Sequence, residues 1–210
     1  MTDRAGNGGI VALAAIVALG GALVLWWKSQ QRGAGGGRAV IPAGGLPNPD
    51  RETTGEKIGA RLAGVLGFVN FPTHYDAAII TAANATGISP KVLKSVLISE
   101  SSLNPKATGA AGELGIAQFM PATWAEESRK FWGETLPPEA AYDPYKAIPV
   151  AANYIAWLLR QTRGEYAAAL AAYNGGIGNY KRGTLPKVSW QYARKILRRA
   201  GLDSRLPDGV

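Results

Sequence analysis

Residues 89–101 read Ser89-Pro-Lys-Val-Leu-Lys-Ser-Val-Leu-Ile-Ser-Glu-Ser101 and contain both a helix start and an apolar helix face. Serine followed by proline is a common start, because serine can cap free backbone N–H groups and proline fits the first turn. Leu93, Val96 and Leu97 recur at three- and four-residue spacing, so they share one face of the helix, and Glu100 extends that face. The other polar residues are expected elsewhere on the helix, namely Lys91, Lys94 and Ser95. The segment therefore predicts an amphipathic helix with a carboxyl group on its apolar side.

The same helical pattern continues along residues 70–202. Proline or serine starts, alanine-rich apolar runs and glycine stops recur, and alternating strand patterns of useful length are absent. The expected helices cover 75–86, 90–99, 121–131, 143–161, 165–173 and 188–199. We therefore expect an all-α domain over 70–202.

The amino-terminal part of the chain has a different composition. Residues 10–27 carry no charged or strongly polar side chain, and a helix of roughly 18 residues nearly crosses a hydrocarbon core about 30 Å thick. Trp26, Trp27 and Lys28 fit the boundary between lipid and water. A cleavable signal peptide or a buried soluble helix is the alternative, although no small-residue cleavage site follows. The expected organisation is a short tail over 1–9, a single transmembrane helix over 10–27 and a flexible Gly/Pro-rich linker over 28–57.

The length, the cysteine and histidine counts and the net charge of the chain exclude several kinds of functional site. The chain has 210 residues, 47% of them hydrophobic, enough for one globular domain with appendages. Without cysteine, disulfides, cysteine nucleophiles and thiolate metal sites are excluded. A single histidine, His74, excludes a multi-histidine metal site, and we interpret it as an ordinary residue near a helix start. The net charge of +8 favours an anionic partner without choosing between nucleic acid, phospholipid and cell-wall polymer.

Glu100 is the candidate catalytic group. A carboxyl group on an apolar helix face is desolvated, which disfavours its charged form and raises its pKa. A raised pKa is what a general acid for glycoside cleavage requires near neutral pH. The alternative from the residues alone is a glutamate at a helix end that points to solvent.

Three separated motifs give this residue a context. Glu100-Ser101 is followed by Gly112-Glu-Leu-Gly-Ile-Ala-Gln-Phe-Met-Pro-Ala-Thr-Trp124 and then by Ala172-Tyr-Asn-Gly-Gly176. In this order they resemble the soluble lytic transglycosylase domain, a relative of goose-type lysozyme, over about residues 75–200. Ser189-Trp-Gln-Tyr192 looks like that family's closing Thr-x-x-Tyr. Ala117 stands where the family has methionine, so the detail of the sugar contacts is expected to differ.

The resemblance implies a lysozyme-like fold and a reaction without a cofactor. Glu100 would protonate the glycosidic oxygen between N-acetylmuramic acid and N-acetylglucosamine, then act as base on the muramoyl C6 hydroxyl to close a 1,6-anhydro ring. The N-acetyl group of the sugar would take the place of a second carboxylate, and a scheme that uses Glu113 is the alternative. The substrate-binding residues implied by position are Ser101, Gln118, Tyr173, Asn174 and Tyr192.

Each of these residues also has a purely structural interpretation. Gln118 could cap the following helix, Asn174 could end its helix, and Ser101 could be a helix-end hydroxyl. The two tyrosines could be core residues.

The carboxy-terminal region is basic. Its cations are Lys181, Arg182, Lys187, Arg194, Lys195, Arg198, Arg199 and Arg205. They form either a solvated helix face or a surface for anionic wall polymer or phospholipid. Few aromatic residues interleave with these charges, so no specific nucleic acid is expected.

The function predicted from the sequence is a peptidoglycan lytic transglycosylase. The alternatives are a hydrolytic muramidase on the same fold, a non-catalytic peptidoglycan-binding protein of a virion or secretion machine, and a basic membrane-tethered DNA-binding protein. The expected location is a bacterial membrane with the domain facing the periplasm. Cations after the apolar run favour a cytoplasmic domain by the positive-inside rule. A cytoplasmic domain conflicts with a substrate in the periplasm. The conflict disappears if the chain lies in the membrane of a phage virion, which is assembled in the host cytoplasm and later delivered to the wall; virion or envelope proteins would then be its partners.

Overall fold

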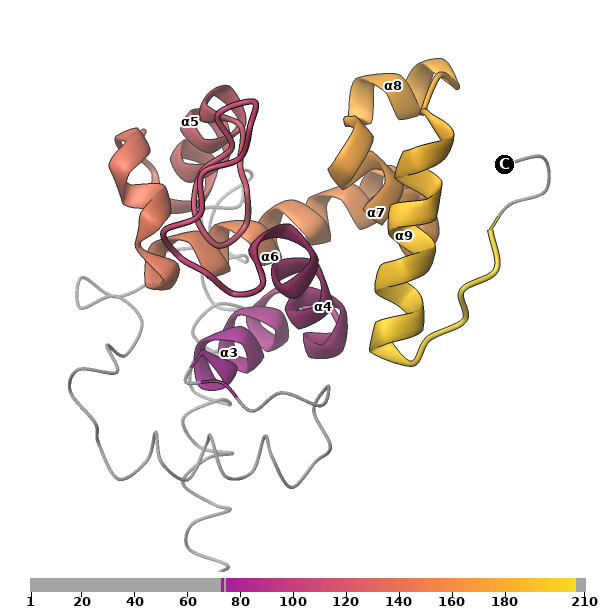
Figure 1. Ribbon diagram of the computed structural model, residues 1–210, viewed down its shortest axis with the longest axis horizontal. Helices are drawn as coiled ribbons and strands as arrows, with labels where there is room; N and C mark the ends of the chain where they lie inside the picture. The colour runs from indigo at the N-terminus through magenta and orange to yellow at the C-terminus, as the bar shows by residue number, and fades with distance from the viewer. Residues whose placement is uncertain (1–72, 74, 207–210) are drawn as a thin grey trace, which may run out of the picture.

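The computed structural model describes residues 73 and 75–206, and this part of the chain is built from helices (Figure 1). Isolated β-bridges join Thr108 to Leu114 and Leu114 to Phe119 in the long loop before α5. The expectation of an all-α domain is confirmed for this region. In chain order the helices are α3 (Asp76–Thr86), α4 (Pro90–Ser101), α5 (Pro121–Trp132), the 3-10 helix η1 (Pro138–Tyr142), α6 (Pro144–Gln161), α7 (Tyr166–Gly175), α8 (Ile177–Arg182) and α9 (Lys187–Ala200).

The predicted helices are all present with small shifts at their ends. The helix expected over 90–99 continues to Ser101, so Glu100 lies within its last turn. Ser89 is the N-cap of α4, but its side chain makes no capping bond, and its backbone N–H instead donates to the Tyr166 hydroxyl at 2.8 Å. Sequence analysis missed η1 and α8, which are too short for a periodic pattern.

Helix α6 is the longest of the described helices and runs between the two ends of the domain (Figure 1). It packs against α3, α5 and α7, while α9 packs against both α7 and α4. Figure 1 shows α7, α8 and α9 grouped at one end and α5 at the other. Helix α4 lies between them and packs against α3, α6 and α9.

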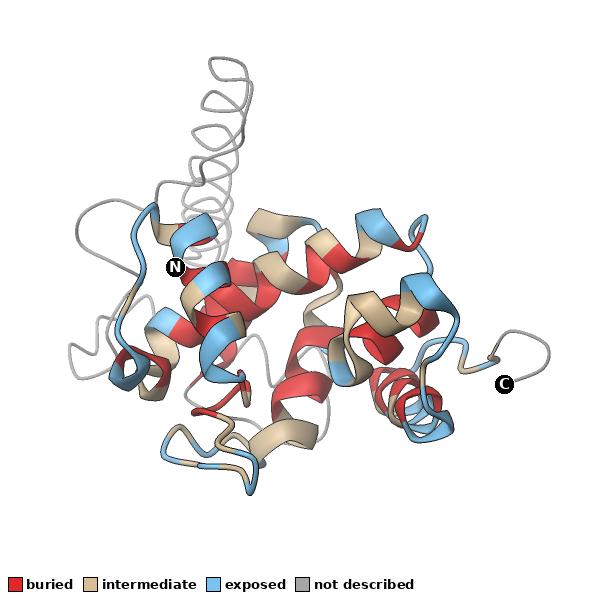
Figure 2. Cartoon of the chain, turned by 90° about the horizontal axis from the view of Figure 1, so that it is seen from above, coloured by how far each residue is buried: buried red, intermediate tan, exposed pale blue. Residues whose placement is uncertain are grey.

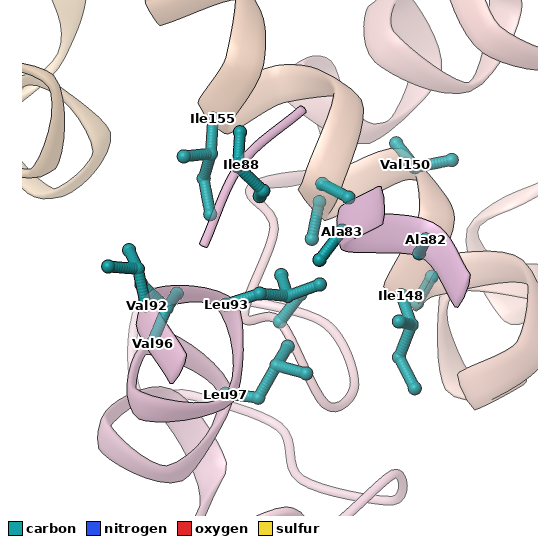
Figure 3. Packing of buried hydrophobic residues seen from close by; sticks show 14 of the residues in the cluster. Ala82, Ala83, Ile88, Val92, Leu93, Val96, Leu97, Ile148, Val150 and Ile155 are labelled. Atoms are coloured by element: carbon teal, nitrogen blue, oxygen red, sulfur yellow. The ribbon is translucent and has the colours of Figure 1, made fainter. Parts of the chain in front are cut away.

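The core surrounds α4. Val92, Leu93, Val96 and Leu97 are fully buried and lie among side chains of α3 and α6 (Figure 3). Full burial of such a side chain contributes roughly 1.5–3 kcal/mol. The apolar face predicted for this helix is therefore correct, and Figure 2 shows the buried residues gathered on the inward sides of the helices.

Burial on α4 extends beyond its apolar face, because Lys94 and Ser95 are also buried. Lys94 Nζ lies 2.7 Å from Asp76 Oδ1 in the first turn of α3, and both side chains are almost completely enclosed. Helices α3, α6 and α9 all contact α4, so little of its circumference remains for solvent. The lysine tolerates burial because a carboxylate on α3 supplies the opposite charge.

Several expectations fall on residues that the structure does not describe. These are the tail over 1–9, the membrane helix over 10–27, the linker over 28–57 and His74. Within the described part of the chain, none of the helices combines the length and the apolar character needed to cross a bilayer.

Candidate active site

Glu100 lies in the last turn of α4, and its carboxyl group faces α9. The Tyr192 hydroxyl of α9 donates a hydrogen bond to Glu100 Oε1 at 2.5 Å. The two residues are far apart in the sequence, and the packing of α4 against α9 brings them together. The structure therefore places a phenolic hydroxyl directly on the Glu100 carboxyl group.

Burial sets the protonation behaviour of Glu100. It raises the pKa of this carboxyl from its ordinary 4.5 to about 7, and the charge of Glu113 adds to the increase. The Tyr192 hydrogen bond and the positive charge of Lys195 act in the opposite direction and lower the pKa. The desolvated carboxyl expected from the sequence is present, and near neutral pH it populates both its protonated and its ionised form.

Both tyrosines near this carboxyl stay protonated. Burial is the main cause that raises the pKa of Tyr173 and of Tyr192 well above 10, and the neighbouring charge of Glu100 raises both further. They are therefore hydrogen-bond donors throughout the working range of pH.

Ser101 and Tyr173 hold the loop that follows α4 close to Glu100. The Ser101 hydroxyl donates to the Ile116 carbonyl at 2.8 Å, and the Tyr173 hydroxyl donates to the Ala117 carbonyl at 2.9 Å. Helices α4 and α7 thus fix adjacent residues of the loop. These two bonds bring together the three sequence motifs, which are Glu100-Ser101, residues 112–124 and residues 172–176.

Gln118 braces the loop from inside. Its Nε2 donates to the Gly115 carbonyl at 2.7 Å and to the Ala107 carbonyl at 3.2 Å, while its backbone has φ of 48°. It does not cap α5, whose N-cap is Met120. Gly115 has φ of 67°, and a Cβ there would lie 2.0 Å from the Ala141 carbonyl oxygen, so the glycine is required by close packing.

Asn174 is the exposed member of the candidate set. Its Oδ1 accepts a hydrogen bond from the Ser189 hydroxyl of α9 at 2.9 Å. The next residue, Gly175, lets α9 approach, because a Cβ there would lie 2.5 Å from both Ser189 Oγ and Leu185 Cδ2. Ser189, which replaces the family's threonine, therefore anchors the Asn174 side chain.

Sequence reasoning missed two cations of α9 that lie beside this site. Arg199 Nη1 donates to Ser99 Oγ at 2.6 Å and to the Ser95 carbonyl at 3.4 Å, so it ties α9 to α4 one residue before Glu100. Lys195 acts on Glu100 through its charge. The spacing of these residues from Tyr192 was the available signal, since positions three, four and seven residues apart share a helix face.

Glu113 is held by its own loop. Its Oε2 accepts the Ala111 N–H at 3.0 Å, and its carboxylate lies over Gly109, where a Cβ would approach to 2.1 Å.

Among residues 75–206, no group of three or more His, Cys, Asp and Glu side chains lies together as metal ligands would.

Replacing Tyr192 with phenylalanine tests the hydrogen bond to Glu100. Removing a bond that lowers the pKa of Glu100 should raise that pKa above 7, and the lost orientation should slow any acid–base reaction at this carboxyl roughly 10- to 100-fold. The pH dependence of the rate is the measurement, and its alkaline limb should move upward. Tyr180→Phe in α8 is the matched control and should leave the profile unchanged.

The raised pKa of Glu100 should also appear in folding stability. The native state binds this proton more tightly than the unfolded chain, so the stabilisation is complete below about pH 4.5 and is lost as pH rises through about 7. Glu100→Gln stays neutral, so the variant should gain up to roughly 3 kcal/mol relative to the parent between these limits. Urea unfolding of both proteins at several pH values measures the difference, and a constant difference would contradict the pKa increase.

The chain is similar in sequence to known transglycosylases. The family model of the transglycosylase SLT domain matches residues 77–191, more than half of the chain. Peptidoglycan transglycosylase gp16 of Escherichia phage T7 is 32% identical over 139 residues, which cover 61% of this chain and 10% of that protein. The transglycosylase of Enterobacteria phage PRD1 is 32% identical over 127 residues, covering 59% and 42% of the two chains. Membrane-bound lytic murein transglycosylase C of Actinobacillus succinogenes is 30% identical over 110 residues, covering 46% and 30%.

A solved structure is similar in fold. The lytic transglycosylase Slt of Pseudomonas aeruginosa, determined as an inactive mutant, superposes with a TM-score of 0.57 at 23% identity, over 74% of this chain and 30% of that one. The expected all-α, lysozyme-like fold is thereby confirmed. The chain spans less than half the length of the relatives named above.

Proposed function

Because the chain belongs to the transglycosylase SLT domain family, we propose that it is a peptidoglycan lytic transglycosylase with Glu100 as its acid and base. The observation that carries the proposal is the partly buried Glu100, with a pKa of about 7 and a hydrogen bond from Tyr192. The names of phage and bacterial relatives support the same substrate and reaction.

The reaction begins with protonated Glu100. Its proton passes to the glycosidic oxygen as the bond from that oxygen to the muramoyl C1 breaks, and the sugar's own N-acetyl oxygen stabilises C1. The resulting carboxylate then takes the proton of the C6 hydroxyl, whose oxygen bonds to C1 and closes the anhydro ring. Glu100 ends protonated, and no water is consumed. A pKa near 7 suits both steps, because neither form of the carboxyl is costly at neutral pH.

The neighbouring residues divide into two proposed roles. Asn174 is exposed and held by Ser189, which favours direct contact with hydroxyl or acetamido groups of the sugar. The polar atoms of Ser101, Gln118 and Tyr173 bond to loop carbonyls, which favours a role in shaping the site. Tyr192 orients the carboxyl oxygen that it contacts.

The proposal extends to the location of the domain. The apolar run over 10–27 would anchor the chain in a membrane, the linker over 28–57 would tether it, and residues 70–202 would reach the wall. Relatives include proteins named as membrane-bound and proteins of phages, which supports a bacterial envelope or a virion membrane. Protease protection of the domain in inverted and right-side-out vesicles tests the orientation.

Digestion of purified peptidoglycan tests the reaction itself. A lytic transglycosylase releases muropeptides that end in an anhydro ring, whereas a muramidase releases products heavier by one water molecule, and mass spectrometry separates the two. Binding without released products would indicate a structural protein. Salt-sensitive DNA binding without cleavage would indicate the nucleic-acid alternative.

A further inference from the structure

The outer face of α9 carries a concentration of positive charge. We define this face by Lys187, Arg194, Lys195 and Arg198, which are all exposed. Their spacing places them on one side of the helix. The opposite side packs against α7 and α4 through buried residues, namely Ser189, Trp190, Ala193, Ile196, Leu197 and Ala200.

No acidic residue within α8 or α9 neutralises this face. Residues 177–200, which include α8 and α9, contain no Asp or Glu, and the exposed cations Lys181 and Arg182 of α8 add to the charge. The close ion pairs within residues 75–206 join other side chains. Like charges on one helix repel one another, and an external anion would remove that cost.

The outer face of α9 meets the candidate active site through Lys195. This residue lies three positions after Tyr192 on the same helix, and its charge lowers the pKa of Glu100. An anionic group bound at the Lys195 end of this face would therefore lie near Glu100. That continuity favours a ligand belonging to the substrate strand over a separate lipid surface or nucleic acid.

We propose that the outer face of α9 binds the carboxylates on the peptide stems of the glycan strand that is being cleaved. This inference rests on the proposed function, because it makes the peptide-bearing strand the preferred substrate. The free carboxylates of a peptide stem extend outward from the glycan, whereas strands freed of their peptides by an amidase carry only the lactyl carboxylate on the muramic acid ring itself. Arg194 and Arg198 can each engage a carboxylate with two parallel hydrogen bonds, and Lys187 and Lys195 act as point charges.

Binding measurements on the full chain test the inference. A Glu100→Gln background prevents cleavage, and the triple substitution Lys187→Gln, Arg194→Gln and Arg198→Gln removes charge without touching Lys195. The two ligands are purified peptidoglycan and the same glycan strands freed of peptides by an amidase. The triple variant should bind peptide-bearing strands roughly 3- to 30-fold more weakly, as expected for three exposed charge contacts, and its binding should depend less on salt.

A matched control separates position from total charge. Lys91→Gln, Lys146→Gln and Arg160→Gln remove the same charge from exposed sites on α4 and α6, and this variant should bind like the parent. Equal losses in both triple variants, or equal losses on peptide-free strands, would overturn the inference. So would unchanged peptidoglycan binding together with lost binding to phosphatidylglycerol vesicles, which would assign the face to lipid.

The outcomes also distinguish this inference from the proposed function. If the chain with Glu100 intact cleaves peptidoglycan while the triple variant binds normally, only the role of α9 is wrong. If the triple variant loses binding as expected while the intact chain releases no products, the proposed reaction is wrong and the binding face remains.

Discussion

Glu100→Gln should lower the rate of peptidoglycan cleavage by roughly three orders of magnitude, because it removes the only proton donor and acceptor in the proposed reaction. Glutamine has nearly the same shape and can still accept the Tyr192 hydrogen bond, so the fold should persist. The neutral amide also avoids the cost of ionising a buried carboxyl, so the variant should be at least as stable near neutral pH. Release of anhydro-muropeptides from purified peptidoglycan measures the rate, and circular dichroism checks the fold.

Glu113→Gln is the matched control for this prediction. Its charge raises the pKa of Glu100, so removing it should lower that pKa and move the alkaline limb of the rate profile downward. The maximum rate should change far less than in Glu100→Gln, since the Glu113 carboxylate bonds within its own loop. Retained cleavage in Glu100→Gln with lost cleavage in Glu113→Gln would assign the acid and base to Glu113, and comparable losses in both variants would support the two-carboxylate scheme.

The burial of the candidate acid Glu100 was accessible from the sequence because it depends on the periodicity of one helix. The three- and four-residue spacing of Leu93, Val96 and Leu97 places Glu100 on the buried side, and burial then raises its pKa. The resemblance of Ser189-Trp-Gln-Tyr192 to the family's closing motif singled out Tyr192 as a candidate site residue. Both statements need only local periodicity and the order of motifs along the chain.

The supporting contacts were not accessible in the same way. The partners of Ser101 and Tyr173 are backbone carbonyls of the loop, which carry no signature in the sequence. Arg199 meets Ser99 only because α9 packs against α4, a contact between residues a hundred positions apart. Residues with long-range partners therefore looked like ordinary helix-end or surface side chains.

The burial of Lys94 could not be predicted from the sequence either. The periodicity of α4 correctly placed this lysine away from the face of Leu93, but it could not show that α3 closes over the remaining side. A single helix pattern describes which residues share a face. It does not say how many faces other helices cover.

Replacing Asp76 with alanine should destabilise the domain by about 3–5 kcal/mol, the usual cost of removing one member of a buried ion pair. Lys94 is fully buried and would lose the carboxylate that lies 2.7 Å from its Nζ. Asp76 Oδ2 also accepts the Thr73 N–H at 3.2 Å in the entry to α3, and that bond would be lost as well. Urea unfolding near neutral pH measures the difference, with the slope of the transition compared to confirm that the same cooperative unit unfolds.

The double substitution Asp76→Leu with Lys94→Met decides what the measured loss means. If the loss comes from an uncompensated buried charge, the double variant should recover most of the stability, because apolar side chains of similar volume replace both charges. If it instead comes from the entry to α3, the double variant should remain as unstable as Asp76→Ala. Since α4 carries both Lys94 and Glu100, a double variant that recovers stability should also recover cleavage. A stable but inactive double variant would show that the ion pair is needed to position α4 for the reaction as well as to stabilise the fold.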